Sequence, residues 1–426
     1  MLTALLLACD TPTQTADEAP TVNAAEQAAP LPEAPVAALQ GTPKHALLLV
    51  VDTLRADVLA EADTPVLDAL AAHGDQADRA WSGGTWTVPS VVTLLTGMPV
   101  REHGWDLPSA RMGKYPRLPE VPTLPVVLRE AGFATAGFYA NPYLSQDLGF
   151  ERGWDTWQRT GDRVVVKQLT KHVAGWEEGE RHFLYVHLLG PHSPLRPNEA
   201  SRLKHGVAAS WIDEKIGFEV GVCKRNREED ARQQYGAAYT AVVEETDALV
   251  GQVLEALGEH AQDTVILVTS DHGELLGEHG VCGHGRHVWE QLTGVPMISR
   301  GVDLPASVGG ANVAALLTGA LGVEHTWPTP ADQVLPLVSQ REGQLALSTD
   351  GRHKAVWDAE GELAVYDLQA DPAESKPLEA ADTVGGLVAA RAAWEAAHGA
   401  STAELEGEVQ LAPEVVEELR ALGYVD

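Results

Sequence analysis

The sequence HALLLVVD, residues 45–52, is an apolar run that stops abruptly at Asp52. Runs of this kind are typical of strands that are covered on both faces of a parallel sheet. Similar runs follow at 132–139, 182–189 and 264–269. Patterns typical of helices separate the runs, at 64–72, 122–131 and 235–257. The alternation predicts an α/β fold with a largely parallel central sheet flanked by helices on both faces.

The character of the sequence changes after residue 323. Short strand-like segments predict a small antiparallel sheet from residues 345–348, 354–357 and 363–366, the last two joined by a turn at 358–361. Helices are expected at 378–398 and 413–422. We therefore divide the folded part into a main domain, 44–323, and a C-terminal subdomain, 324–426.

The first 43 residues have a different composition. Residues 10–43 are rich in Ala, Pro, Thr and acidic residues, which predicts a disordered tether. Residues 5–9 read LLLAC, which is similar to the end of a bacterial lipoprotein signal with Cys9 as the lipidated residue. The alternative is a chance cysteine. The first interpretation makes 1–9 a signal remnant and predicts an exported protein, lipid-anchored in a bacterial envelope (periplasmic or at the cell surface).

The charge of the chain limits its partners. It has 61 acidic and 30 basic residues, which gives a formal net charge of −31. Such a chain repels nucleic acid and anionic lipid, so we expect no nucleic-acid partner and no membrane contact except through a lipid at Cys9. An anionic substrate has to be held locally, by a metal ion or a few positive groups.

Two of the predicted strands end in acidic residues. Asp52 follows the first strand, and Asp271 and His272 follow the strand at 264–269. Ligands bind beyond the carboxyl ends of strands in open α/β sheets, so these three side chains are candidates for a divalent metal site. Each aspartate alone has a second interpretation, as an ordinary turn or helix cap.

A further candidate is Thr87, at the start of a predicted helix that Gly97 ends. Pro89 suits the first turn of that helix. Thr87 is either a helix N-cap only, or a nucleophile whose alkoxide is stabilised by a metal ion and by the helix dipole.

Five motifs in order resemble the sulfatase family of the alkaline phosphatase superfamily, over about residues 44–423. They are VVDTLRAD at 50–57, TVPS with LLTG and EHG within 87–104, VHL with PHSP within 186–194, TSDHGELLGEHG with GHG within 269–285, and VYDL with DPAE within 365–374. The resemblance implies an alkaline-phosphatase/sulfatase-like α/β fold with one divalent metal ion at the end of the sheet.

The resemblance also implies roles for individual residues. Carried over, the metal ligands are Asp52, Asp271, His272 and the nucleophile Thr87. The residues that contact substrate oxygens are Asn141, His192 and His284, and the two histidines also take part in catalysis. His187 and His279 are either neighbours of these groups or packed structural residues. The metal ion is Ca²⁺, Mg²⁺, Mn²⁺ or Zn²⁺.

The chain departs from the family pattern at three positions. Thr53 stands where most sulfatases have a second aspartate, and Val91 stands where their nucleophile motif has an arginine. Thr87 replaces the Cys or Ser that is matured to formylglycine, and a threonine cannot become that aldehyde. Because formylglycine serves to expel sulfate, we expect a preference for phosphoric over sulfuric esters.

The leading hypothesis is therefore a metal-dependent hydrolase of anionic esters, sulfuric or phosphoric, in which Thr87 forms a covalent intermediate. Its substrate would be a small molecule, a glycan or a lipid headgroup. The alternatives are a phospho-group transferase of the same fold and a catalytically inactive, sulfatase-like binding lipoprotein.

Two cysteines remain in the folded part, Cys223 and Cys282. In an oxidising compartment a disulfide between them would hold a pocket wall to the loop of His284. The other interpretations are two unrelated thiols, or Cys282 as a metal ligand. All three stay open at the level of the sequence.

Overall fold

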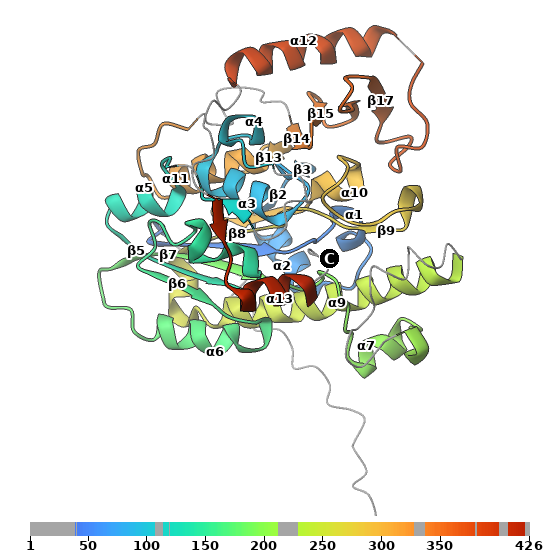
Figure 1. The fold of residues 1–426 in the computed structure, drawn as a ribbon. Helices are drawn as coiled ribbons and strands as arrows, with labels where there is room; N and C mark the ends of the chain where they lie inside the picture. The colour runs from blue at the N-terminus through green and yellow to red at the C-terminus, as the bar shows by residue number, and fades with distance from the viewer. Residues whose placement is uncertain are drawn as a thin grey trace, which may run out of the picture. The chain divides into compact units, whose positions relative to one another are not determined.

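A seven-stranded sheet lies at the centre of the computed structural model of the chain, in the order β2-β12-β8-β1-β7-β5-β6 (Figure 1). Its strands are β1 (His45–Val51), β2 (Asp75–Gln76), β5 (Phe133–Tyr139), β6 (Thr156–Arg159), β7 (Arg181–Leu188), β8 (Thr264–Thr269) and β12 (Met297–Arg300). The strands from β8 to β6 are parallel, whereas β12 and β2 continue the sheet in antiparallel fashion. The predicted largely parallel sheet is confirmed, and each of the four apolar runs is one of its strands.

The structure describes residues 39, 41–106, 114–118, 120–211, 229–327, 337–379, 381–399 and 408–421. Within these ranges, none of the helices combines the length and the apolar character that a membrane span requires. Cys9, most of the predicted tether and Cys223 lie outside the described residues.

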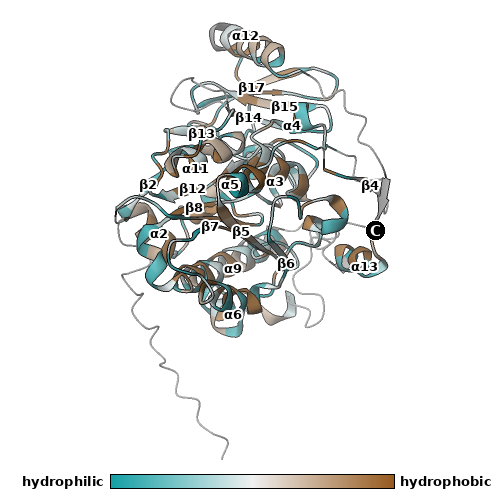
Figure 2. Cartoon of the chain, turned by 90° about the vertical axis from the view of Figure 1, so that its left-hand side faces the viewer, coloured by the Kyte–Doolittle hydropathy of each residue, from teal (hydrophilic) through white to brown (hydrophobic). Residues whose placement is uncertain are grey.

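Helices cover both faces of the sheet, as predicted. One face carries α3 (Thr87–Thr96), α5 (Leu124–Glu130) and α11 (Val313–Ala320). The opposite face carries α2 (Pro65–His73), α6 (Asp162–Val173) and α9 (Glu229–Glu255). Figures 1 and 2 show the two layers, with the mostly apolar central strands between them.

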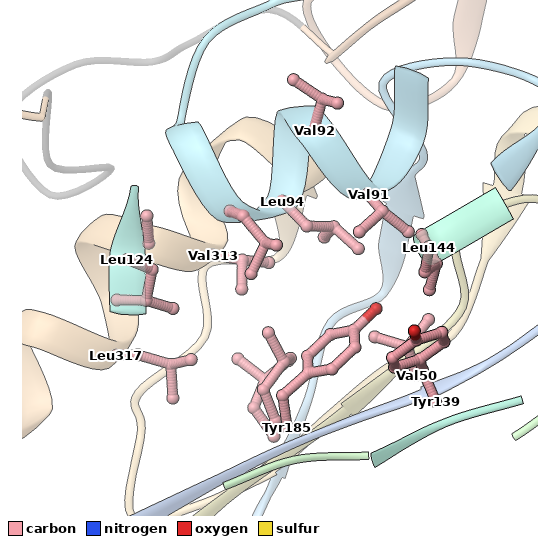
Figure 3. Packing of buried hydrophobic residues seen from close by; sticks show 14 of the residues in the cluster. Val50, Val91, Val92, Leu94, Leu124, Tyr139, Leu144, Tyr185, Val313 and Leu317 are labelled. Carbon is pink, nitrogen blue, oxygen red and sulfur yellow. The ribbon is translucent and has the colours of Figure 1, made fainter. Parts of the chain in front are cut away.

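The alternation of side chains along β1 explains this sandwich. Leu48 and Val50 pack with the α3 layer, whereas Leu47, Leu49 and Val51 pack with the α9 layer. Successive side chains of a strand point to opposite faces, so a strand that is apolar throughout requires a cover on both. Figure 3 shows residues of α3, Val91 and Leu94 among them, above Val50 and Tyr185 of the sheet.

A separate four-stranded antiparallel sheet follows the main sheet, in the order β14-β15-β16-β17. Its strands are β14 (Leu337–Arg341), β15 (Gln344–Ser348), β16 (His353–Trp357) and β17 (Leu363–Asp367), and α12 (Ala381–Ala397) packs on it. The small antiparallel sheet is confirmed, with β14 as a strand that the sequence analysis did not predict. The domain boundary at 323/324 stays a prediction.

The remaining elements are short. The helices are α1 (Ala56–Leu59), α4 (Val100–His103), α7 (Glu199–Lys204), α10 (Glu290–Thr293) and α13 (Pro413–Ala421). The strands are β3 (Arg79–Trp81), β4 (Lys114–Pro116), β9 (Leu275–Leu276), β10 (Cys282–Gly283), β11 (Gly294–Val295), β13 (Ser307–Gly309) and β18 (Glu408–Gln410). The 3₁₀ turns are η1 (Pro142–Leu144), η2 (Gln146–Leu148), η3 (Ala209–Trp211), η4 (Gly258–Asp263), η5 (Glu278–Gly280) and η6 (Gly310–Asn312).

A buried histidine connects α4 to α3. The Trp105 N–H donates to His103 Nδ1 at 3.1 Å, so the ring proton lies on Nε2, which is 3.1 Å from Thr93 Oγ1. A second ring proton, on Nδ1, would point at the Trp105 N–H, which is itself a donor, inside the protein. Burial lowers the pKa of His103 to about 3, from an ordinary value of 6.5.

This contact predicts a loss of stability in acid. A histidine with a lowered folded-state pKa stabilises fully above pH 6.5, and this stability is lost as the pH falls from 6.5 towards 3. Between pH 7.5 and 5.5 the contribution of His103 to the free energy of unfolding should fall by about 1.4 kcal/mol. In urea unfolding, the free energy of unfolding should change less between pH 7.5 and pH 5.5 for His103→Gln than for the parent. An equal change in the free energy of unfolding in the two proteins would contradict the lowered pKa of His103.

Candidate active site

The carboxyl ends of β8 and β1 bring the predicted metal ligands together. Val50 points to the α3 face of the sheet, and Asp52, two residues further, continues on that face. Asp271 follows the neighbouring strand. His272 Nε2 lies 3.6 Å from Asp52 Oδ1 and 3.6 Å from Asp271 Oδ2. The two aspartates and the histidine therefore converge on one buried point.

The two buried carboxylates at this point repel each other. Asp52 and Asp271 are fully buried. Burial, together with repulsion from Asp271, raises the pKa of Asp52 well above its ordinary value. Burial acts in the same direction on Asp271, but the nearby His272 and His187 outweigh it and hold the pKa of Asp271 below its ordinary value. Without a cation the pair therefore favours one charged and one protonated carboxyl.

The residues fit a divalent cation. Asp52 Oδ1, Asp271 Oδ2 and His272 Nε2 are buried atoms without a hydrogen-bond partner in the described part of the chain. His272 Nδ1 lies 2.8 Å from the carbonyl oxygen of Gly273, so the ring proton lies on Nδ1 and the electron pair on Nε2. This electron pair faces both carboxyl groups, so a cation between them would be attracted by the imidazole nitrogen and by the carboxylate charge at once. Metal-bound histidines are commonly oriented in this way.

Thr87 is held beside the aspartates by Asn141. The Asn141 Nδ2 group donates to Asp52 Oδ2 at 2.7 Å and to Thr87 Oγ1 at 3.0 Å. Its Oδ1 accepts from the Tyr143 N–H at 3.0 Å, which fixes the orientation of the amide. Trp86 is the N-cap of α3 and Thr87 is the first helical residue, so the interpretation of Thr87 as the N-cap is wrong. Its hydroxyl lies at the positive end of the helix dipole.

His192 and His284 lie next to His272. The ring centroids of His284 and His272 are 4.4 Å apart, and those of His284 and His192 are 5.0 Å apart. Burial lowers the pKa of His192 to about 3 and that of His284 to about 4. His192 Nδ1 contacts the carbonyl oxygen of Ser193, and His284 Nδ1 lies 3.2 Å from Glu274 Oε1. The structure thus places every predicted site residue in one cluster, while their roles stay predictions.

Several residues around this cluster were given no role by the sequence analysis. Glu274 is buried, and burial raises its pKa to about 7. Tyr239 donates its hydroxyl to the Thr53 carbonyl oxygen and accepts from the Arg55 N–H, which fixes the turn after Asp52. Arg55 donates to the carbonyl oxygen of Glu274 at 2.9 Å and so joins the two loops that bear the aspartates. Glu274 and Arg55 stand inside quoted motifs, whereas no sequence signal identified Tyr239.

The cysteines can be assigned in part. Cys282 is disulfide-bonded, which excludes a free thiolate at that position as a metal ligand. Cys223, the partner considered in the sequence analysis, lies outside the described residues.

The comparison with known families decides the assignment. The family model described as Sulfatase matches residues 44–318, more than half of the chain. The chain belongs to the sulfatase family. The resemblance inferred from the five motifs is therefore confirmed, while the assignment of Thr87 as a nucleophile stays a prediction.

Individual members of the family are distant relatives. An arylsulfatase of Clostridium perfringens is 21% identical over 310 residues, which cover 55% of this chain and 63% of that protein. A sulfatase of Formosa agariphila is 28% identical over 158 residues, which cover 32% of this chain and 31% of that protein. The match thus spans less than two thirds of the length of these relatives.

Solved structures share the fold. One, a protein in complex with its substrate D-glucosamine-2-N,6-O-disulfate, is 17% identical, with a TM-score of 0.67 over 84% of this chain and 98% of that chain. The phosphonate monoester hydrolase of Agrobacterium radiobacter is 16% identical, with a TM-score of 0.65 over 87% of this chain and 100% of that chain. At such identities the likeness establishes the alkaline-phosphatase/sulfatase-like fold alone.

Gly273, next to His272, offers a test of the packing of this sulfatase-family site. A Cβ atom at Gly273 would lie 2.0 Å from the backbone oxygen of Gln291. Gly273→Ala should therefore lower the free energy of unfolding by about 1–3 kcal/mol. Gly236→Ala is the matched control, because Gly236 lies in α9 with open space around it. The control should be neutral or more stable by up to about 1 kcal/mol in urea unfolding. Equal stabilities of the two variants would contradict the packing described for the loop.

Proposed function

We propose that the chain is a metal-dependent hydrolase of anionic esters in which Thr87 is the nucleophile. The observation that carries the proposal is the position of Asn141, whose amide nitrogen binds Asp52 Oδ2 and Thr87 Oγ1 at the same time. A hydroxyl at a helix N-terminus is thereby held beside a buried carboxylate and imidazole cluster. Nucleophiles of this kind are activated by the electrostatics around them.

The chain's own groups support the attack of Thr87 on the ester. The hydrogen bond from Asn141 and the amino end of α3 both stabilise negative charge on Oγ1. In the first step Oγ1 gives up its proton and forms a bond to phosphorus while the bond to the leaving oxygen breaks, and the leaving oxygen takes up one proton, so that an alcohol departs and the net proton count is unchanged. In the second step water attacks phosphorus, which releases phosphate and restores the Thr87 hydroxyl.

A divalent cation would be held by Asp52, Asp271, His272 and Thr87. When bound, it supplies positive charge that neutralises the carboxylates and the reacting oxygens. This role agrees with the buried, unpartnered atoms of Asp52, Asp271 and His272 in the described structure. Ca²⁺, Mg²⁺, Mn²⁺ and Zn²⁺ remain the candidates.

His192 and His284 are proposed to contact the charged oxygens of the substrate and to protonate the leaving group. Both belong to the same group of rings as His272. The Glu274 carboxyl beside His284 Nδ1 fixes the orientation of that ring. His284 is also the most exposed of the predicted site residues, with 11% of its side chain accessible. We therefore place the leaving group on this side of the site.

The proposed substrates are phosphoric esters of a small molecule, a glycan or a lipid headgroup, with sulfuric esters as poorer substrates. Thr87 cannot form the aldehyde that sulfate release uses in other members of the family. The likeness in fold to a phosphonate monoester hydrolase agrees with phosphorus chemistry on this scaffold. Lipid attachment at Cys9 and export to a bacterial envelope remain proposals that rest on residues 5–9 of the sequence.

Substitution of the proposed nucleophile tests the mechanism. Thr87→Ala should lower kcat by about 10³-fold or more, because no covalent intermediate can form. Thr87→Ser should keep part of the activity, since it retains a hydroxyl. Ser90→Ala is the matched control, because Ser90 lies one turn further along α3 and is equally buried. The measurement is the steady-state rate on a nitrophenyl phosphodiester. An inactive Ser90→Ala together with an active Thr87→Ala would contradict the assignment of Thr87 as the nucleophile.

The nature of the ester is tested separately. On matched nitrophenyl esters, kcat/KM should be higher for the phosphate monoester or diester than for the sulfate. The physical reason is that a sulfated Thr87 can be released only by direct attack of water. A clear preference for the sulfate ester would overturn the argument from Thr87 and would require a different route of desulfation.

A further inference from the structure

His187 lies beside Asp271, one of the proposed ligands of the cation. It is on β7, the strand that neighbours β1 on the side away from β8. In the register of the sheet His187 is level with Val50 of β1 and Tyr139 of β5, two residues that face α3. The His187 ring therefore lies on the face of the sheet that carries the aspartates.

The ring atoms of His187 are buried without partners. Its side chain has no solvent exposure, and neither Nδ1 nor Nε2 has a hydrogen-bond partner in the described residues. His187 Nε2 lies 3.5 Å from Asp271 Oδ2, an atom that is itself unpartnered. Leaving such groups unsatisfied in a protein interior is costly. The arrangement therefore indicates an occupant between them.

The spacing of these atoms fits ligands of one cation. Bonds of about 2.1 Å to one metal ion place neighbouring ligand atoms about 3.0–3.4 Å apart, the longer value holding for four ligands and the shorter for five or six. Asp271 Oδ2 is 3.5 Å from His187 Nε2 and 3.6 Å from His272 Nε2. Ligand atoms of Asp52, His187 and Asp271 lie within 4.8 Å of one another. These distances are longer than hydrogen bonds and close to the separation of atoms that share an ion.

The residue after Asp52 adds no carboxylate to the site. Thr53 supplies no carboxylate, and its backbone N–H donates to Asp271 Oδ1 at 3.2 Å. Its φ of 61° places the backbone in the left-handed region. The turn at Thr53, which Tyr239 holds in place, therefore orients Asp271 without adding a negative ligand to the site.

We propose that His187 is a further protein ligand of the divalent cation, which gives a set of two carboxylate oxygens and two imidazole nitrogens besides Thr87. The inference rests on the proposed cation site and deepens it. Imidazole ligands favour Zn²⁺, whereas Ca²⁺ takes oxygen ligands, and Mn²⁺, which suits carboxylates, also accepts imidazole nitrogens. The site should therefore bind Mn²⁺ in preference to Ca²⁺.

Pulsed electron paramagnetic resonance of the full chain loaded with one equivalent of Mn²⁺ tests the ligand set. The parent should show coupling to two imidazole nitrogens, and His187→Gln and His272→Gln should each show one. A single coupled imidazole in the parent, unchanged in His187→Gln, would overturn the inference. Because the parent alone gives the count, the test does not depend on the folding of a variant.

Mn²⁺ affinity gives a second readout. The Kd of His187→Gln should rise by more than about 100-fold, beyond the 10- to 100-fold typical of losing an outer hydrogen-bonding partner. His103→Gln, a buried histidine on α4, should keep the parental Kd. If His187→Gln had the parental Kd, His187 would be a packed structural residue and not a ligand, which would contradict the inference. If the parent itself bound no Mn²⁺, the proposed cation site would fail as a whole.

Discussion

The constraint on which the structure depends is the burial of two carboxylates, Asp52 and Asp271, at the ends of adjacent strands. Their pairing follows from the parallel register of β1 and β8, which places Val50 beside Thr269. Two negative charges in a fully buried place repel each other strongly and cannot both persist without compensation. A cation satisfies this constraint, and it also accounts for the orientation of His272, whose electron pair faces both carboxylates.

The surrounding elements serve to hold this arrangement. Tyr239 of α9 fixes the turn after Asp52 from one face of the sheet, and the amino end of α3 presents Thr87 from the other. Asn141, which follows β5, connects the aspartate to the hydroxyl. The site is therefore built from groups that no single segment supplies.

The sequence predicted the parts of the fold that carry an unmistakable apolar pattern. The four central strands and the antiparallel sheet were identified, whereas β6, with the sequence TWQR, and β12, with MISR, are short and mixed in polarity. In the site, Asp52 and Asp271 were found because each follows a buried strand. The sequence leaves two interpretations of His187 open, because a position inside an apolar run does not show to which face of the sheet the side chain points. Only the register of β7 against β1 and β5 reveals that it faces the aspartates.

Mass spectrometry can show whether Thr87 carries the reacting group during turnover. The protein is mixed with a nitrophenyl phosphate ester, quenched in acid during turnover and digested. The peptide of α3 should gain one phosphoryl group, with fragment ions that place it on Thr87. A phosphoryl group on Ser90 or any other residue, or an unmodified Thr87 in every sample that consumes the ester, would show that Thr87 is not the nucleophile.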